Sequence, residues 1–260
     1  MKKKGFTVIE LMLVISIIAL LSSIILISLR SARDKAKIAA SLTFSNQIKS
    51  VIGLETLGEY KFENNLNDTF SPYGNNGSWI GGGAANYADS GNSNLGKSIS
   101  LDGFHYVQIP YSSSLYPRTD LAVTVEAWIK PLAFPTVSFF SVILAKNDYF
   151  ILAYDRNETI DFWIMCDGFT TQAGPSTIKV ELGKWHHIAA TFIPGSGTNN
   201  KVEIYIDGII RWKSGNFSFG STPLSPLQSI LIGSCSGCGF DNFNGLIDEV
   251  RIYYEPMPLE

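Results

Sequence analysis

The chain has 260 residues, with 20 Lys and Arg against 23 Asp and Glu, and a formal net charge of −3 at neutral pH. This near balance argues against a nucleic-acid partner, because no basic stripe is present to neutralise phosphates. Gly is frequent and charged residues make up only 17% of the chain, a composition that favours a turn-rich β protein over a helical one.

The first 30 residues combine a cationic start with a long apolar run. Lysines occupy positions 2 to 4, and residues 11–29 carry no charge. A helix over these residues is about 28 Å long, close to the thickness of a bilayer core. The lysines predict that the N-terminus stays on the cytoplasmic side and that the rest of the chain is exported. A cleaved secretory signal peptide fits less well, because no clear small-x-small cleavage site follows the run.

One carboxylate, Glu10, lies inside the apolar segment that begins at Phe6. A charged side chain at membrane depth is costly unless it is paired, so a functional role is expected. If the chain is cut after Gly5, the new amino group of Phe6 lies about one helical turn from Glu10. Between neighbouring chains, the same pair would fix the axial register of apolar helices that otherwise slide freely.

The run of residues 4–11, Lys-Gly-Phe-Thr-Val-Ile-Glu-Leu, resembles the processing motif of type IV prepilins and type II secretion pseudopilins. The resemblance implies cleavage between Gly5 and Phe6 by a membrane prepilin peptidase, followed by methylation of the Phe6 amine. It also implies that Glu10 is the carboxylate used for assembly with other pilin subunits.

The residues after the apolar run are expected to continue the same helix outward. Basic residues mark the membrane exit, at Arg30, Arg33, Lys35 and Lys37. A weak apolar stripe follows, with spacings of three and four: Ile38, Leu42, Ser45, Ile48 and Ile52. We predict a leader peptide at 1–5 and a pilin-type helix at 6–57, with a membrane span at about 6–29. The expected location is the inner or cytoplasmic membrane, a pilus or the cell surface, with an extracytoplasmic head. Many pilins carry a helix-breaking Pro here, and this chain has none between residues 1 and 71.

From residue 58 onward, short alternating runs separated by turn residues replace the helical spacing. Residues 124–130 and 201–207 each place apolar side chains on one face with a period of two, as expected of half-buried strands. Asp207-Gly208 predicts a two-residue hairpin turn, because both positions tolerate positive φ. About a dozen such runs predict a mainly β fold, in which two antiparallel sheets form a sandwich over residues 58–260.

Seven stretches of this region, in order, resemble a concanavalin A-like, laminin-G-type domain of the kind common in bacterial surface proteins. They are residues 60–63, 98–103, 106–110, 123–131, 183–189, 202–208 and 243–253. The resemblance implies a jelly-roll sandwich that serves adhesion by binding an extracellular glycan or protein.

Glucanases also use this fold, but the sequence offers no suitable pair of carboxylates. A retaining glycosidase needs two carboxyl groups about 5 Å apart, which on one strand requires acidic residues two apart. Asp248 and Glu249 are neighbours and point to opposite faces, and Asp207, which shares a face with Glu203, is committed to a turn. The Ser-rich run at 112–114 has no linked His and acid. We therefore predict no enzymatic activity and no catalytic residues.

Calcium is the expected cofactor, in a structural role. It takes six to eight oxygen ligands, and residues 64–68 and 74–77 form an oxygen-rich loop. The family resemblance implies a calcium held by one acidic residue in this loop and one near the last strand, which here are Asp68 and Asp248. The alternative is that both are turn or capping aspartates.

The remaining candidates have ordinary structural explanations. His186 and His187 are adjacent on a strand, so they point apart and cannot chelate one metal together. Sugar binding would need exposed aromatic rings flanked by amides. The candidate rings, each of which could equally belong to the core or its rim, are Trp79, Tyr87, Trp163 and Trp212. The ligand-binding residues are therefore not assigned.

Three cysteines are too few for a disulfide framework or for an all-cysteine zinc site. Cys235 and Cys238 can close a small loop disulfide if the head is exported, and two free thiols in a Gly-rich turn are the alternative. Cys166 then has no partner.

Two other functions stay open beside adhesion. The chain could be a structural pseudopilin of a type II secretion or DNA-uptake system, with the sandwich as a spacer or substrate contact. A surface glycoside-active enzyme is the third hypothesis, disfavoured by the missing carboxylate pair. The bulk of the head favours a tip, sparse or anchored subunit over a major one.

Overall fold

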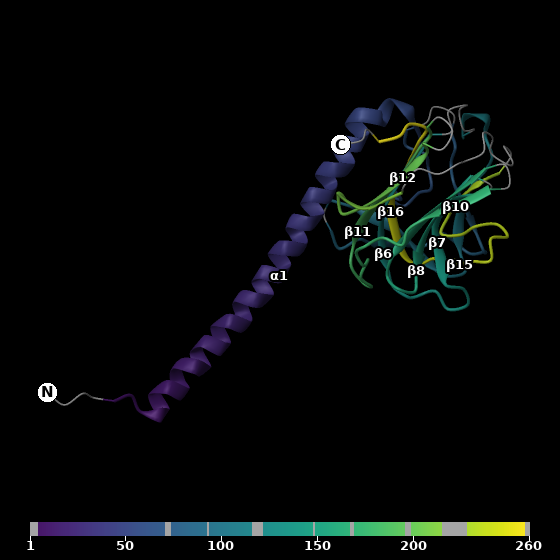
Figure 1. The fold of residues 1–260 in the computed structure, drawn as a ribbon. Coiled ribbons are helices and arrows are strands. Elements are labelled where there is room, and N and C mark those ends of the chain that lie inside the picture. Colours follow the sequence, from purple (N-terminus) through teal and green to yellow (C-terminus); the bar gives the residue numbers. More distant parts are fainter. Residues whose placement is uncertain are drawn as a thin grey trace.

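The computed structural model describes residues 5–70, 74–92, 94–115, 122–147, 149–166, 169–195, 199–214 and 228–257. They form one long helix, with a sandwich of two sheets beside its C-terminal half (Figure 1). The predicted fold class, a mainly β sandwich preceded by a single long helix, is confirmed. Most of the predicted leader, residues 1–4, lies outside the described residues.

Helix α1 (Val8–Ile52) runs for 45 residues without a break. It begins with a capping box in which Thr7 is the N-cap and Glu10 the reciprocal partner. Its N-terminal half is exposed and apolar, and it is the only described helix long and apolar enough to cross a membrane. A short turn of 3-10 helix, η1 (Gly53–Glu55), follows, and the first strand starts at Thr56.

Sheet A has eight strands in the order β13-β12-β11-β6-β16-β4-β3, and β1 pairs with β16 beside that path. Its strands are β1 (Thr56–Tyr60), β3 (Tyr87–Asp89), β4 (Lys97–Asp102), β6 (Val123–Pro131), β11 (His186–Ile193), β12 (Lys201–Ile206), β13 (Ile209–Lys213) and β16 (Asn244–Tyr253).

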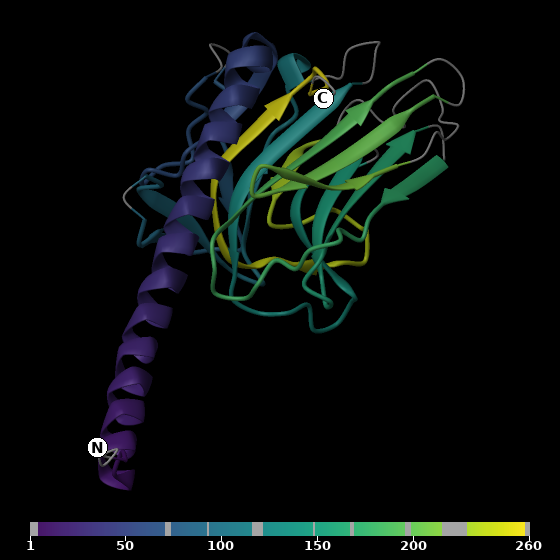
Figure 2. The same cartoon turned by 60° about the vertical axis from the view of Figure 1, so that its left-hand side comes forward.

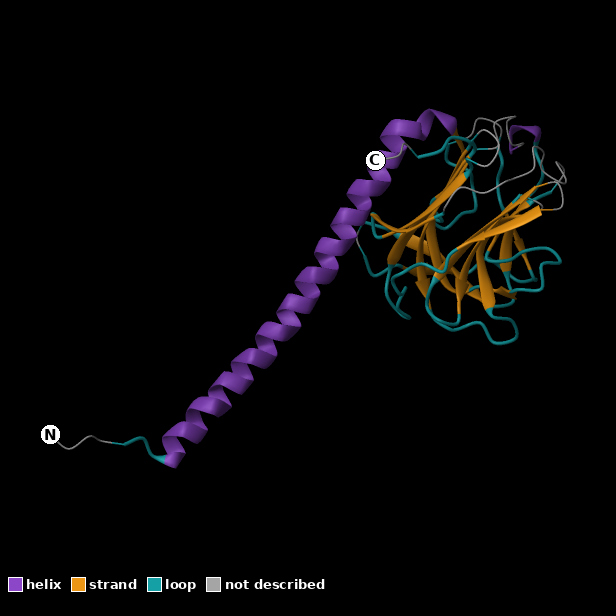
Figure 3. Ribbon diagram, in the orientation of Figure 1, coloured by secondary structure: helices purple, strands orange, loops and turns teal. Residues whose placement is uncertain are grey.

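Sheet B also has eight strands, in the order β10-β9-β8-β7-β14-β5-β2, and β15 pairs with β7 in parallel. Its strands are β2 (Ser78–Ile80), β5 (Tyr106–Ile109), β7 (Phe140–Lys146), β8 (Phe150–Asp155), β9 (Ile160–Cys166), β10 (Phe169–Ala173), β14 (Ile230–Ile232) and β15 (Asp241–Asn242). The two sheets face each other with loops at both ends (Figure 3).

The core fills the space between the sheets, and the period-two patterns decide which side chains enter it. On β6, Val125, Ala127 and Ile129 are fully buried in this core, as the sequence predicts. The predicted hairpin turn joins β12 to β13, where Asp207 and Gly208 have φ values of 55° and 77°.

The outer face of sheet A carries the C-terminal half of α1 (Figure 2). Ile48 and Ile52 pack there with Ala189, Tyr253 and Met257 in a second apolar cluster. A groove of about 740 Å³ runs between this part of the helix and the hairpin β12–β13. The apolar stripe seen in the sequence therefore docks the helix onto the head.

Charged contacts fix the position of the helix along the sheet. Lys37 lies 2.8 Å from Asp207, whereas Ile52, farther along the helix, packs beside Tyr253. Strand β16 runs in the same sense, from Asn244 to Tyr253. We call the end of the sandwich at Asn244 and Asp207 the proximal end, because it is nearest the N-terminal half of α1. The opposite end is the distal end.

Candidate functional site

The N-terminal segment presents the predicted processing residues to their surroundings. Phe6 is exposed, and a side chain built on Gly5 would meet no other atom within 4 Å. Glu10 Oε2 accepts hydrogen bonds from the Thr7 backbone N–H (2.9 Å) and from Thr7 Oγ1 (2.8 Å), and the Glu10 N–H donates to Thr7 Oγ1 (3.2 Å). The carboxylate is therefore held at the helix start, next to the expected cleavage point. The cleavage and assembly roles themselves stay predictions.

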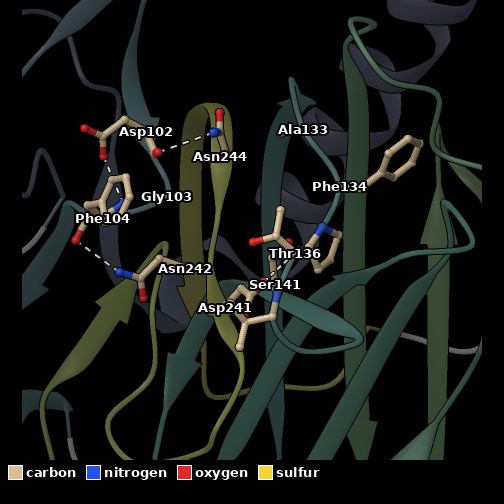
Figure 4. Close-up of a pocket in the computed structure, with 12 residues that line it drawn as sticks. Asp102, Gly103, Phe104, Ala133, Phe134, Thr136, Ser141, Asp241, Asn242 and Asn244 are labelled. Atoms are coloured by element: carbon tan, nitrogen blue, oxygen red, sulfur yellow. Dashed lines mark hydrogen bonds between the residues drawn. The ribbon is translucent and has the colours of Figure 1, made fainter.

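A pocket of about 390 Å³ opens at the proximal end of the sandwich (Figure 4). Three segments meet there: the β4–β5 loop, the β6–β7 loop, and β15 with the start of β16. The lining residues used below are Asp102, Phe104, Phe134, Asp241, Asn242 and Asn244.

The β6–β7 loop is held in place from two sides. Asp241 accepts hydrogen bonds from the backbone N–H groups of Thr136 (2.5 Å), Val137 (2.9 Å) and Ser138 (2.9 Å). Partial burial raises the pKa of Asp241, but these hydrogen bonds outweigh it and the pKa is lowered overall. From the other side, Arg156 donates to the carbonyl oxygens of Pro135 (3.0 Å) and Thr136 (2.6 Å).

The β4–β5 loop is ordered by a second carboxylate, Asp102. Its Oδ1 accepts from the backbone N–H groups of Phe104 (2.9 Å) and His105 (3.0 Å), and its Oδ2 lies 2.8 Å from His105 Nδ1. Burial raises the pKa of Asp102, but these hydrogen bonds together outweigh it and lower the pKa to about 2. Asn242 and Asn244 donate side-chain hydrogen bonds to the backbone carbonyls of Phe104 and Asp102, respectively.

The pocket combines ordered amides and carboxylates with exposed aromatic rings. Phe104 is 79% exposed and Phe134 is 42% exposed, and they lie on opposite sides of the pocket (Figure 4). Such a mixture suits a ligand with apolar faces and hydroxyl groups. The pKa values of its two carboxylates, Asp102 and Asp241, are both lowered, whereas the acid of a glycosidase has a raised pKa.

The four aromatic candidates from the sequence lie elsewhere. Trp79 stacks on His105 with ring centroids 5.2 Å apart. Trp163 is buried on the outer face of sheet B against Phe140 and Phe240. The other two, Tyr87 and Trp212, pack against the core. Sequence reasoning missed the pocket residues, although the Asn-Phe-Asn run at 242–244 and the exposed ring after Asp102-Gly103 were available signals.

Asp68 and Asp248 have different surroundings. Asp68 Oδ1 accepts backbone N–H groups of Glu59 (3.0 Å) and Phe70 (3.1 Å). Asp248 is fully buried, its Oδ1 accepts the Glu249 N–H (2.7 Å), and its Oδ2 has no hydrogen-bond partner among the described residues. Burial, with neighbouring Glu249, raises the pKa of Asp248 to about 9.

These two aspartates do not form a metal site by themselves. Within the part of the chain that the structure describes, no group of three or more His, Cys, Asp or Glu side chains is placed to hold a metal ion. The buried Asp248 oxygen without a hydrogen-bond partner would suit a cation. Calcium therefore stays a prediction.

The histidines and cysteines have structural contacts. His186 Nδ1 lies 3.1 Å from Asp207 Oδ2, and His187 Nε2 lies 2.8 Å from Glu126 Oε2, so the two rings have separate partners. Cys235 and Cys238 form a disulfide, which settles the choice left open by the sequence. The side chain of Cys166 lies outside the described residues.

Comparison with protein families matches both parts of the chain. Residues 101–260 match the model described as the concanavalin A-like lectin/glucanases superfamily. Residues 1–26 match the prokaryotic N-terminal methylation motif. The search of curated proteins found no match.

Several solved structures have a similar fold. Domain 4 of AbnA, a GH43 extracellular arabinanase from Geobacillus stearothermophilus, in complex with arabinotriose, has a TM-score of 0.60 and 23% identity, over 78% of this chain and 94% of that chain. The binding domain of Paraclostridial Mosquitocidal Protein 1 has a TM-score of 0.59 and 13% identity, over 78% and 50%. The binding domain of botulinum neurotoxin DC in complex with rat synaptotagmin II has a TM-score of 0.57 and 13% identity, over 80% and 50%. The similarity therefore spans about half the length of the latter two chains, and at these identities it shows the fold alone.

Proposed function

The chain belongs to the concanavalin A-like lectin/glucanases superfamily, and on this premise we propose that it is a pilin-like adhesin whose head binds an extracellular glycan or protein without cleaving it. One observation carries the proposal: a single unbroken helix joins a prokaryotic N-terminal methylation motif to a lectin-type sandwich. The motif supplies export, anchoring and assembly, and the sandwich supplies binding.

The N-terminal part supports a membrane anchor. Its apolar half is exposed along its whole length, so an apolar surrounding must cover it. The flanking lysines favour a cytoplasmic N-terminus and an exported head, and the Cys235–Cys238 disulfide in that head suits an oxidising compartment. After cleavage, Phe6 and Glu10 are the groups we assign to assembly.

The proximal pocket is the ligand site that we assign. Phe104 and Phe134 offer ring surfaces, while Asn242 and Asn244 offer amides that the surrounding loops hold still. Among structures of similar fold, one domain was solved with arabinotriose and another with a protein, so both ligand classes are compatible with the architecture. The mixed lining favours a glycan.

Processing is the first test. The full chain is expressed with a prepilin peptidase, and intact-mass and N-terminal analysis compares wild type with Gly5→Ala. We expect the wild-type product to begin at Phe6 and the variant to stay uncut. A wild-type chain that stays uncut, or is cut near residue 30, would overturn the pilin part of the proposal.

Ligand binding is the second test. The processed protein is applied to a glycan array, and Phe104→Ala is compared with Leu54→Ala, which removes a similarly exposed side chain far from the pocket. We expect Phe104→Ala to weaken binding by about tenfold, since a lost aromatic stacking contact is worth roughly 1–1.5 kcal/mol. Normal processing with no binding to any glycan or protein partner would favour the structural pseudopilin instead.

A further inference from the structure

The proximal end of the sandwich exposes a cluster of large apolar side chains that the folded head does not bury. The cluster, which we call the apolar rim, consists of Phe104, Leu132, Phe134, Val137 and Phe139. Val137 is 90% exposed, at the tip of the β6–β7 loop. Phe104, Phe134 and Val137 line the same pocket, and exposed apolar side chains that gather in this way mark an interaction site more often than scattered ones do.

The rim is pre-organised. The hydrogen bonds of Asp241 and Arg156 fix the β6–β7 loop from both sides, and Arg156 N–H also donates to Phe139 O (3.1 Å). The loop therefore cannot fold back to cover its own apolar side chains without breaking these bonds. Its exposure is built into the fold, which indicates an external partner.

The position of the rim along the helix identifies that partner. Gly183 N–H donates to Pro131 O (2.7 Å), so the 181–185 loop lies directly beside the start of the rim. The same loop is linked to the helix through His186: Glu181 N–H donates to His186 Nε2 (3.1 Å), and Lys37 Nζ of the helix lies 3.2 Å from His186 Nδ1. The uncharged run of α1 ends at residue 29. The proximal loops are thus close to the point where the helix would leave the bilayer core.

The direction of the proximal loops agrees with this placement. Figures 1 and 3 show the loops at this end on the side of the sandwich that faces the N-terminal half of α1. The headgroup layer extends about 5–7 Å beyond the hydrocarbon on each side, and membrane helices are tilted by about 20° on average. A tilt of α1 toward the head moves the rim closer to that layer.

We propose that, while the chain is anchored, the apolar rim docks on the outer surface of the same bilayer that α1 spans. The inference rests on the proposed function in one respect, the membrane anchoring of the helix. Because the anchor already holds the head at the surface, docking is intramolecular and needs little affinity of its own. Arg30, Arg33 and Lys35 follow the uncharged run of the helix and favour anionic headgroups.

Docking has a consequence for the ligand site. Phe104, Phe134 and Val137 belong both to the rim and to the lining of the pocket. Contact with lipid therefore covers the pocket in the anchored subunit, and departure from the membrane into a filament uncovers it. The bilayer acts as a cover that keeps unassembled subunits from binding ligand.

The test uses the processed full chain, one copy per nanodisc, in matched discs of ordinary and brominated phosphatidylcholine and phosphatidylglycerol. Three single variants report lipid contact by the loss of tryptophan fluorescence beyond the wild-type background: Val137→Trp on the rim, Leu54→Trp at an equally exposed distal position, and Val14→Trp in the span. We expect quenching at positions 137 and 14, and none beyond background at 54. If Val137→Trp does not fold, Phe134→Trp replaces it.

The outcomes separate the two proposals. Quenching at position 14 without quenching at 137 would overturn the docking of the rim and leave the anchor intact. No quenching at position 14 would contradict the membrane anchor itself, and the docking proposal with it. A position-137 signal that is shifted to the blue but not quenched would mean that protein rather than lipid covers the rim, since a second subunit is absent from each disc, and docking would again be wrong.

Discussion

The two halves of α1 have the same backbone and opposite surroundings. From Leu11 to Leu29 the side chains are uncharged and exposed, and none of them is buried against the described part of the head. From Lys37 to Ile52 the helix lies on sheet A and is held by two buried isoleucines and several charged contacts. The comparison shows that apolar side chains alone do not specify what a helix packs against, whereas specific polar pairs fix its position on the sheet.

A buried charge network lies beneath the docked half. Arg251 donates to Glu59 (2.7 Å), to Glu126 (3.2 Å) and to Ser45 of the helix (3.0 Å). Tyr253 and His187 also contact Glu126, at 2.7 and 2.8 Å. Two contacts tie the helix to this network, Ser45 with Arg251 (3.0 Å) and Lys49 with Glu59 (2.7 Å), and both require one rotation and one register of the helix.

The largest expected effect comes from breaking this network at its centre. Arg251→Met leaves Glu59 and Glu126 buried without their main cation, and we expect a loss of about 3–5 kcal/mol in the free energy of unfolding. Denaturant unfolding of the full chain in detergent measures it. Lys49→Met is the matched control: Lys49 also contacts Glu59 (2.7 Å) but is 40% exposed, so its removal should cost at most about 1 kcal/mol. Equal losses would contradict a central role for Arg251.

The second largest effect is expected at the apolar contact between the helix and sheet A. Ile48→Ala removes a side chain that is 4% exposed, and we expect it to cost about 2–4 kcal/mol and to speed hydrogen exchange in the docked half of α1. Val51→Ala, one turn away on the exposed side, should stay within about 0.5 kcal/mol of wild type. Equal changes in the free energy of unfolding would mean that the helix does not pack on the sheet through the face that carries Ile48.

A third prediction concerns Asp248, which lies on β16 together with Arg251. Asp248 is buried and its pKa is raised to about 9. The folded state therefore holds a proton that the unfolded state releases above about pH 4, so this group's contribution to stability is complete below pH 4 and is lost as pH rises toward 9. We expect Asp248→Asn to flatten that slope and to add about 1–3 kcal/mol at neutral pH, because the neutral amide has no charge to desolvate.

The same variant tests calcium. Thermal unfolding of wild type and Asp248→Asn is measured with calcium and with a chelator. If calcium raises the melting temperature of the wild type and not of the variant, the cation takes the place of the proton at Asp248 and the sequence-based calcium prediction is confirmed. If calcium changes the melting temperature of neither the wild type nor Asp248→Asn, protonation is the only means by which the buried carboxyl is neutralised.

The sequence predicted the features whose signals are local. The alternation in residues 124–130 and the Asp207-Gly208 turn depend on neighbours along the chain, and both are found as predicted. The processing motif and the apolar run are equally local, and the family comparison matches them. Such patterns are legible because strand and helix periods repeat over a few residues.

The position of the helix on sheet A and the binding pocket both depend on contacts between residues that are distant in the sequence. Arg251 meets Glu59 across 192 positions, and Asp241 holds Thr136 across 105. No pattern of neighbouring residues in the sequence predicts a contact over such a separation. Whether an aromatic candidate is exposed depends on distant residues in the same way. Trp163 is on the outer face of a strand, but the loop that carries Phe240 covers it. Exposure depends on what the rest of the chain lays over a face.

The smallest expected effect lies at the boundary between the two halves of α1, where Lys37 is the first docked side chain. Lys37 Nζ lies 2.8 Å from Asp207 Oδ2, and His186 Nδ1 lies 3.1 Å from the same oxygen. Because Lys37 is 37% exposed, Lys37→Met should cost only about 0.5–1 kcal/mol at neutral pH. Lys35→Met, on an exposed position of the same turn, should cost nothing measurable.

The pH dependence of this small difference decides its origin. Burial raises the pKa of Asp207, but His186 and Lys37 outweigh it and the pKa is lowered overall, so its charge stabilises the fold above about pH 4 and this contribution is lost as pH falls below that value. The difference between wild type and Lys37→Met should therefore shrink as the pH falls below about 4 and the carboxyl takes up its proton. A difference that persists unchanged in acid would mean that the lysine stem contributes by packing and not by charge, and the docked half of the helix would then begin with an apolar contact after all.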